Sequence, residues 1–163
     1  MSPRVLVAGI GNMFLGDDGF GPEVVRLMST RQVPTHARVA DYGIRGLHLA
    51  YELLDGYDAL VLVDALPADG APGEIRVLEV GPEHVERADG LDAHSMNPTA
   101  VLAHLVSLGG KLPRTYVVGC APVSTQEGIG LSEPVAAAVE PAVATIASLL
   151  NDELAPAGAG EEQ

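Results

Sequence analysis

The chain has 163 residues, of which 22 are acidic and 9 are basic, so its formal net charge is −13. A charge of this sign argues against nucleic acid and against an anionic membrane surface as partners. The length favours one domain with a sizeable core. We expect that domain to occupy residues 1–154, followed by a disordered acidic tail at residues 155–163.

No apolar stretch of the sequence approaches the roughly 18 residues that a membrane span needs. The first expected strand begins almost at once, without the charged and apolar regions of a signal peptide. Cys120 is the only cysteine, which excludes an intrachain disulfide and a cluster of thiolate metal ligands. These features predict a cytoplasmic protein with no membrane contact, and we expect a monomer.

The first expected element is a buried strand that leads into a glycine-rich loop. Residues 5–8 form a continuous apolar run, which is typical of a strand buried on both faces of a parallel sheet. Gly9 and Gly11 follow, and glycine permits positive φ angles and the close approach of a ligand. The loop, which leads into a helix near Gly19, is therefore a candidate site.

This loop does not match a dinucleotide-binding fingerprint. The G-x-G-x-x-G motif would place its third glycine where this chain has Phe14. The loop also carries Asp17 and Asp18, whose negative charges would repel a phosphate. Carboxylates suit a cation better. Either acid could instead form an Asx-turn and cap the helix that follows.

The later elements alternate between strands and helices. We expect helices at 19–29, 47–54, 99–108 and 132–150, and strands at 37–40, 59–63, 74–80 and 115–120. Residues 65–73 are too few for a crossover helix, so the strand at 74–80 should return antiparallel, and its mixed faces place it at an edge. Residues 81–93 are interpreted as a loop. The pattern predicts a three-layer α/β/α sandwich around a five-stranded, mostly parallel sheet.

Acidic residues follow two strands at the edge where open α/β sheets bind ligands. Asp18 and Asp64 can converge there with His94, and they would supply two oxygen donors and one imidazole. That set is compatible with zinc or nickel, and three ligands leave positions open for a carbonyl or a water. The residues are too far apart in sequence to form a compact motif, so this site is a hypothesis.

Each candidate has an alternative role. Asp64 could cap the turn after its strand, and a lone loop histidine such as His94 is more often solvated. His84, in an acidic loop, is the best rival ligand. Asp41 would hold a ribose if a nucleotide were bound. Cys120 ends an apolar strand and is interpreted as a packed thiol, because no basic partner or helix N-terminus would activate it.

Six segments of the chain together resemble the maturation endopeptidases of nickel-iron hydrogenases, over residues 4–150. They are G-I-G-N-M-F-L-G-D-D-G-F-G, D-Y-G-I-R-G, L-V-D-A, H-S-M-N-P, V-V-G-C-A-P and G-I-G-L-S. The resemblance implies an α/β/α fold and a metal-dependent, aspartic-type endopeptidase. Enzymes of that family remove a C-terminal extension from the hydrogenase large-subunit precursor after nickel has been inserted.

The resemblance also implies the roles of individual residues. Asp18, Asp64 and His94 match the metal-contacting residues, and Asp41 becomes a further functional candidate; Asp41 or Asp17 could activate the water. Nickel, supplied by the precursor, is the expected metal, and zinc or cadmium could replace it in a crystal. The expected partner is the large-subunit precursor. The alternatives are a non-enzymatic nickel- or nucleotide-binding module, and a related peptidase that acts on a different protein.

Overall fold

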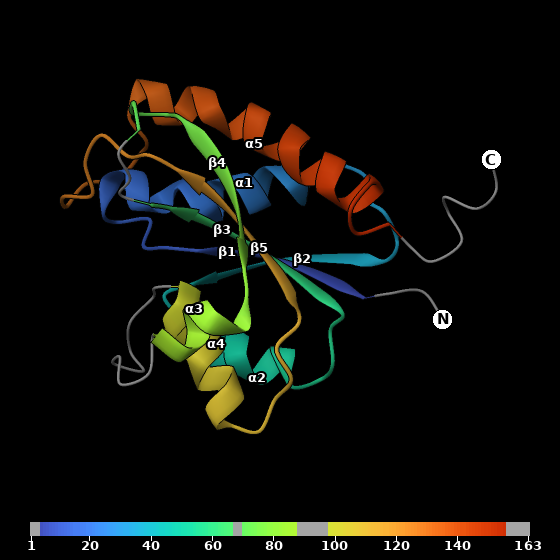
Figure 1. Ribbon diagram of the computed structural model, residues 1–163. Helices are drawn as coiled ribbons and strands as arrows, with labels where there is room; N and C mark the ends of the chain where they lie inside the picture. The colour runs from blue at the N-terminus through green and yellow to red at the C-terminus, as the bar shows by residue number, and fades with distance from the viewer. Residues whose placement is uncertain (1–3, 67–69, 88–97, 156–163) are drawn as a thin grey trace.

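The computed structural model describes residues 4–66, 70–87 and 98–155, and within these ranges the chain forms one five-stranded sheet with helices on both faces (Figure 1). The strands are β1 (Val5–Ile10), β2 (Ala37–Gly43), β3 (Ala59–Ala65), β4 (Ile75–Val80) and β5 (Arg114–Cys120). The helices are the 3-10 turn η1 (Gly16–Gly19), α1 (Phe20–Met28), α2 (Gly46–Leu53), α3 (Pro82–Arg87), α4 (Pro98–Ser107) and α5 (Glu133–Asn151).

The order of the strands across the sheet is β2-β1-β3-β5-β4. All neighbours pair in parallel except β4, which runs antiparallel to β5 at one edge. Every residue of β1 and β3 is buried, as their continuous apolar runs require of central strands. The predicted α/β/α sandwich with an antiparallel edge strand is confirmed.

Successive residues of the central strands point to opposite faces and build two separate cores. Val61 and Val63 pack beneath α1 and α5, whereas Leu60 and Leu62 pack against α2 and α4. Figure 1 shows these helix pairs on opposite sides of the sheet. The same alternation places Asp64 on the face of α2 and α4.

The structure differs from the sequence prediction at several places, of which the following bear on the site. β3 continues through Asp64, because Asp64 and the residue after it still pair with β5. β2 continues to Gly43, so Asp41 lies inside a strand instead of after it. Residues 82–87 form α3 where we expected a loop. The remainder of that expected loop, His94, and the expected tail from residue 156 onward lie outside the described residues.

The expectation that no apolar stretch approaches the length of a membrane span is wrong for α5. This helix has 19 residues, and its most apolar window has a mean hydropathy of 1.3. The alanine-rich sequence carries only Glu133 and Glu140 as charged residues, which accounts for that value. The buried side of α5, including Val135, Ala142 and Ile146, belongs to the core shared with α1. The core helix of a globular protein passes the same test.

Candidate functional site

The candidate site lies at the carboxyl ends of the parallel strands, where the loops after β1, β2 and β5 are joined by backbone hydrogen bonds. The N–H of Gly11 donates to the carbonyl of Gly43, at 2.9 Å. The N–H of Gly16 donates to the carbonyl of Gly128, and the N–H of Gly128 donates back to Phe14, both at 2.8 Å. The three loops therefore form one connected surface.

Glycines in the first loop allow backbone segments to approach each other. Gly11 has a φ of +137°, and a Cβ atom there would lie 2.0 Å from the backbone oxygen of Asp18. A Cβ atom at Gly21 would lie 2.2 Å from the carbonyl oxygen of Val63. Only glycine permits such contacts. These glycines thus place the acidic turn directly against the ends of β1 and β3.

Asp18 lies in η1, and its carboxylate has a fixed orientation. Its Oδ2 accepts a hydrogen bond of 2.7 Å from the backbone N–H of Asn12. The side chain of Asn12 in turn accepts one of 2.9 Å from the N–H of Phe14. The Asx-turn that we considered for the aspartates is therefore made by Asn12. Asp18 is half-buried, so the rest of its carboxylate remains within reach of a ligand.

Asp64 is buried next to Asp18. Its side chain is only 7% exposed, and burial raises its pKa to about 8, with a further contribution from the negative charge of Asp18. A hydrogen bond from the N–H of Ala65 acts in the opposite direction. The two predicted carboxylates are therefore close enough to repel each other, and a cation bound between them would remove that repulsion.

The structure does not describe the third predicted ligand. His94 lies outside the described residues, so its place in the site remains a prediction. Within the described ranges, no group of three or more His, Cys, Asp or Glu residues could hold a metal ion. The rival, His84, lies on α3, where its exposed ring accepts a hydrogen bond of 3.0 Å from the N–H of Gly81.

Asp41 is exposed at the end of the neighbouring strand. Its Oδ1 accepts a hydrogen bond of 2.8 Å from the N–H of Gly43, across an irregularity in the pairing of β2 with β1. Arg45 donates to the backbone carbonyl of the same residue, at 2.7 Å. Asp41 therefore shapes the loop after β2 and remains exposed.

Asp17 has a function that the sequence did not reveal. Its side chain is 1% exposed and accepts four hydrogen bonds from residues far along the chain. The donors are the N–H groups of Val123 (2.8 Å), Ser124 (3.3 Å) and Ser132 (2.7 Å) and the hydroxyl of Ser132 (2.8 Å). Burial alone would raise the pKa of Asp17, but these hydrogen bonds outweigh it and lower the pKa.

We expected the aspartates to cap the helix that follows them, but Asp17 instead binds the start of α5. No side-chain hydrogen bond caps η1 or α1 at Leu15 or Gly19. Ser132 is the N-cap of α5, and Asp17 binds both its N–H and its hydroxyl. No local signal could show this, because Asp17 and Ser132 are 115 residues apart.

Cys120 is a packed thiol, as predicted. It is fully buried at the end of β5, and burial raises its pKa to about 11, with a smaller contribution from the charge of Asp17. A thiol with such a pKa remains protonated at neutral pH and is a poor nucleophile. Cys120 is therefore a poor candidate for a nucleophile at this edge.

Comparisons with known proteins agree on one family. Residues 22–149 match the family model described as hydrogenase maturation protease. The hydrogenase expression/formation protein HupM of Azotobacter chroococcum is 36% identical over 155 residues, which cover 91% of this chain and 72% of that protein. The hydrogenase 2 maturation protease of Escherichia coli is 28% identical over 91% of this chain and 92% of its own length.

Solved structures give the same result. The E. coli hydrogenase maturating endopeptidase HybD superposes with a TM-score of 0.76 at 27% identity, over 92% of this chain and 93% of its own. The hydrogenase 2 maturation peptidase of a Thaumarchaeota archaeon has a TM-score of 0.67 at 31% identity, over 88% of this chain and 95% of its own.

Proposed function

Because the chain belongs to the hydrogenase maturation protease family, we propose that it removes the C-terminal extension of a nickel-iron hydrogenase large-subunit precursor after nickel has been inserted. The family makes the chain a hydrolase. The observation that supports this particular activity is the pair formed by Asp18 and Asp64 at the carboxyl edge of the sheet, where α/β folds bind their ligands.

Nickel enters this proposal as part of the substrate. The precursor carries it to the site, where Asp18, Asp64 and His94 contact it. The described donors fit such a cation, because two carboxylate oxygens are suitable ligands and Asp64 is held in a place where its charge lacks compensation. Dependence of the cleavage on the metal is part of the proposal. Zinc or cadmium could take the place of nickel in a crystal.

Asp41 is the better of the two candidates for activating the attacking water. Both carboxylate oxygens of Asp17 are occupied by hydrogen bonds, which leaves it no free position for a water. Asp41 is exposed. Gly9 of β1 pairs with Asp41 of β2 on one side and with Val63 of β3 on the other. Asp41 is thus two strand spacings from β3, about 10 Å.

The test is to incubate the protein with nickel-loaded and nickel-free large-subunit precursor and to measure the masses of the products. We expect cleavage of the loaded form alone. Equal cleavage of both forms would contradict nickel recognition and favour a related peptidase with another substrate. Saturable binding without cleavage would favour a non-enzymatic module. Asp55→Asn, an exposed aspartate outside the site, is the control and should behave like the wild type.

The remaining properties follow the same proposal. A protein that processes a precursor before its assembly should act where the precursor is made, so we propose the cytoplasm as its compartment. We also propose that it acts as a monomer, without nucleic acid or membrane as partner. Light scattering on the purified protein measures whether it is a monomer.

A further inference from the structure

The five most exposed large hydrophobic side chains among the described residues all lie on loops at the carboxyl edge of the sheet. Every other large hydrophobic side chain in the described ranges is 50% exposed or less. These five form what we call the apolar rim: Met13 (54%), Phe14 (58%), Ile44 (62%), Val123 (54%) and Ile129 (77%). Exposed apolar side chains gathered around one edge are typical of an interaction surface.

The rim is held in place by the backbone. The bridge between Leu15 and Gly128 joins the loop after β1 to the loop after β5. Asp17 fixes the same two loops to each other through Val123 and Ser132. The apolar side chains are therefore presented on a preorganised frame, which lowers the entropic cost of binding a partner.

The segments of the two larger rim loops that carry the exposed apolar side chains are nearly free of charge, although Asp17 and Asp18 follow the first segment directly. In a chain with 19% charged residues, residues 10–16 contain none and residues 121–132 contain only Glu127. Depletion of charged residues together with exposed apolar side chains distinguishes the centre of protein interfaces from the rest of a protein surface. The composition of the rim therefore favours a protein partner.

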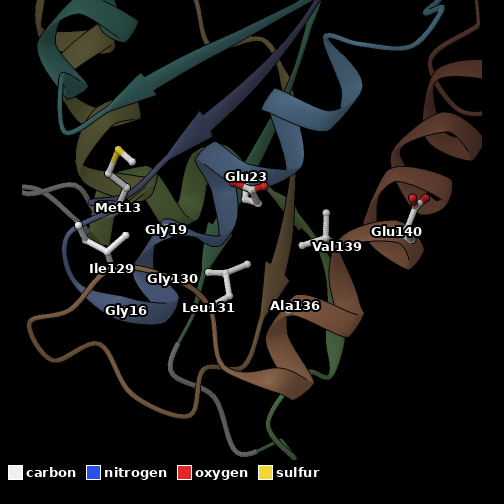
Figure 2. A pocket seen from close by; sticks show the side chains of 10 residues that line it. All are labelled: Met13, Gly16, Gly19, Glu23, Ile129, Gly130, Leu131, Ala136, Val139 and Glu140. Carbon is white, nitrogen blue, oxygen red and sulfur yellow. The ribbon is translucent and has the colours of Figure 1, made fainter.

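A groove of about 470 Å³ opens between these loops and α5. Figure 2 shows Met13 and Ile129 at its loop side and Leu131 and Val139 facing it from the α5 side. Two acids border the groove, and each is paired with an arginine: Glu23 with Arg26 and Glu140 with Arg31. The groove is thus largely apolar and large enough for one or two apolar side chains.

We infer that the apolar rim and this groove are the docking surface for the folded large-subunit precursor, with an apolar side chain of the precursor seated in the groove. The inference rests on the proposed function. Gly16 and Gly19, the ends of the turn that holds Asp18, line the groove, so it is continuous with the candidate site. A precursor that brings its scissile bond to Asp18 therefore lies beside the groove and beside Met13 and Ile129, the two rim residues that line it.

The positions of the groove and of Asp64 indicate a large partner. The groove borders α1 and α5, whereas strand alternation places Asp64 on the side of α2 and α4. A partner that reaches both must cross the edge of the sheet and contact several loops. A folded protein, which covers about 800 Å² of its partner's surface, can do this more readily than a short peptide.

Charge distinguishes the precursor from two other occupants. A second copy of this chain also carries a net charge of −13, and the overall repulsion between two such chains opposes their association. The same repulsion opposes an anionic membrane. The precursor is the occupant that the proposed reaction requires at this edge.

The experiment measures KM and kcat for processing of nickel-loaded precursor by rim variants. Ile129→Ser should raise KM about tenfold, and Val123→Ser should raise it about threefold, with kcat unchanged, because an apolar contact at an interface centre is worth about 1 kcal/mol or more. Val106→Ser is the matched control, since Val106 is 47% exposed on α4 and should leave both constants unchanged. Ala136→Leu should fill the groove and raise KM without disturbing its helix.

The outcomes separate the docking inference from the proposed function. If the wild type does not cleave the loaded precursor, the proposed function is wrong. If the wild type cleaves it and the variants keep KM within twofold of the wild type, the docking surface alone is wrong. A wild-type dimer that Ile129→Ser dissociates, or vesicle binding that Ile129→Ser abolishes, with KM unchanged in either case, would also overturn it in favour of a second copy or a lipid surface.

Discussion

Asp17 and Asp64 are two buried carboxylates at the same edge of the sheet, and their environments are opposite. Asp17 accepts four hydrogen bonds from the loop after β5, and its pKa is lowered. Asp64 is almost as deeply buried, but burial and the charge of Asp18 raise its pKa to about 8. Burial alone therefore does not identify a functional acid. The balance between desolvation and hydrogen bonding does.

The two regions accordingly serve different purposes. Around Asp17 the hydrogen bonds connect the loops and cap α5, so that region is complete without a ligand. Around Asp64, burial and the charge of Asp18 disfavour the ionised carboxylate, and this is the region where we propose that the substrate's metal binds. Asp18, adjacent to Asp17 in sequence, belongs to the second region and is positioned by the first.

The largest expected effect is the loss of processing in Asp64→Asn. Removing one carboxylate of the pair takes away a ligand for the substrate's metal, and we expect the single-turnover rate on nickel-loaded precursor to fall by about 10³-fold. The fold should persist, since the amide is of nearly the same size. Asp55→Asn serves as the control. A rate within tenfold of the wild type would show that Asp64 is not part of the site.

The second prediction concerns the stability of the other region. Asp17→Ala removes the acceptor of four hydrogen bonds and leaves buried N–H groups without a partner, so the free energy of unfolding should fall by about 3 kcal/mol. Urea unfolding measures this change. Asp55→Ala, at an exposed position, should change it by less than about 0.5 kcal/mol. We call these hydrogen bonds of Asp17 to Val123, Ser124 and Ser132 the Asp17 clamp. A loss below about 1 kcal/mol for Asp17→Ala would show that this clamp does not stabilise the fold.

The third prediction uses pH to separate the two acids. The folded-state pKa of Asp64 lies above its unfolded value of 3.8, so between these values the folded protein holds the extra proton and loses stability as pH rises. From pH 5 to pH 7, wild-type stability should fall relative to Asp64→Asn by about 3 kcal/mol, because one proton corresponds to roughly 1.4 kcal/mol per pH unit and the window spans two units.

Asp17 should show the opposite sign. Its folded-state pKa lies below 3.8, so its contribution to stability is complete above that pH and is lost as the pH falls through the folded-state value. The stability difference between wild type and Asp17→Asn should therefore be constant from pH 5 to pH 7 and shrink in stronger acid. Urea unfolding at each pH measures both differences. Parallel pH profiles for the two variants would refute the contrast between the acids.

The fold was largely predictable because its signals are local. The apolar run of β3 and the short connection from β3 to β4 were sufficient to predict a central strand and an antiparallel edge strand. The end of β3 was missed because pairing with β5 carries the strand through Asp64, and such pairing is a long-range contact. α3 was missed because a six-residue polar helix has no clear periodicity.

The closeness of two candidate carboxylates could be predicted from the sequence, whereas the role of Asp17 could not. The topological rule brought Asp18 and Asp64 together correctly, since both are at the carboxyl ends of neighbouring strands. The role of Asp17 depends on Val123 and Ser132, more than 100 residues away, and sequence spacing cannot show such contacts. The contribution of His94 remains a prediction.

The smallest expected effect tests whether the clamp acts through Ser132. Ser132→Ala removes the 2.8 Å hydrogen bond from the hydroxyl to Asp17 but keeps the backbone bond, so the free energy of unfolding should fall by about 1 kcal/mol. Ser148→Ala, at an exposed position on α5, is the matched control and should leave it nearly unchanged. Urea unfolding again supplies the measurement.

The double variant of Asp17 and Ser132 completes the test. If the hydroxyl stabilises the protein through Asp17, Ser132→Ala should cost almost nothing once Asp17 is alanine, which gives a coupling energy of about 1 kcal/mol. Additive losses would mean that the two residues stabilise the protein independently. In that case the lowered pKa of Asp17 would arise from the backbone N–H groups alone, and the contrast with Asp64 would rest on the course of the loop backbone instead of on the capping serine.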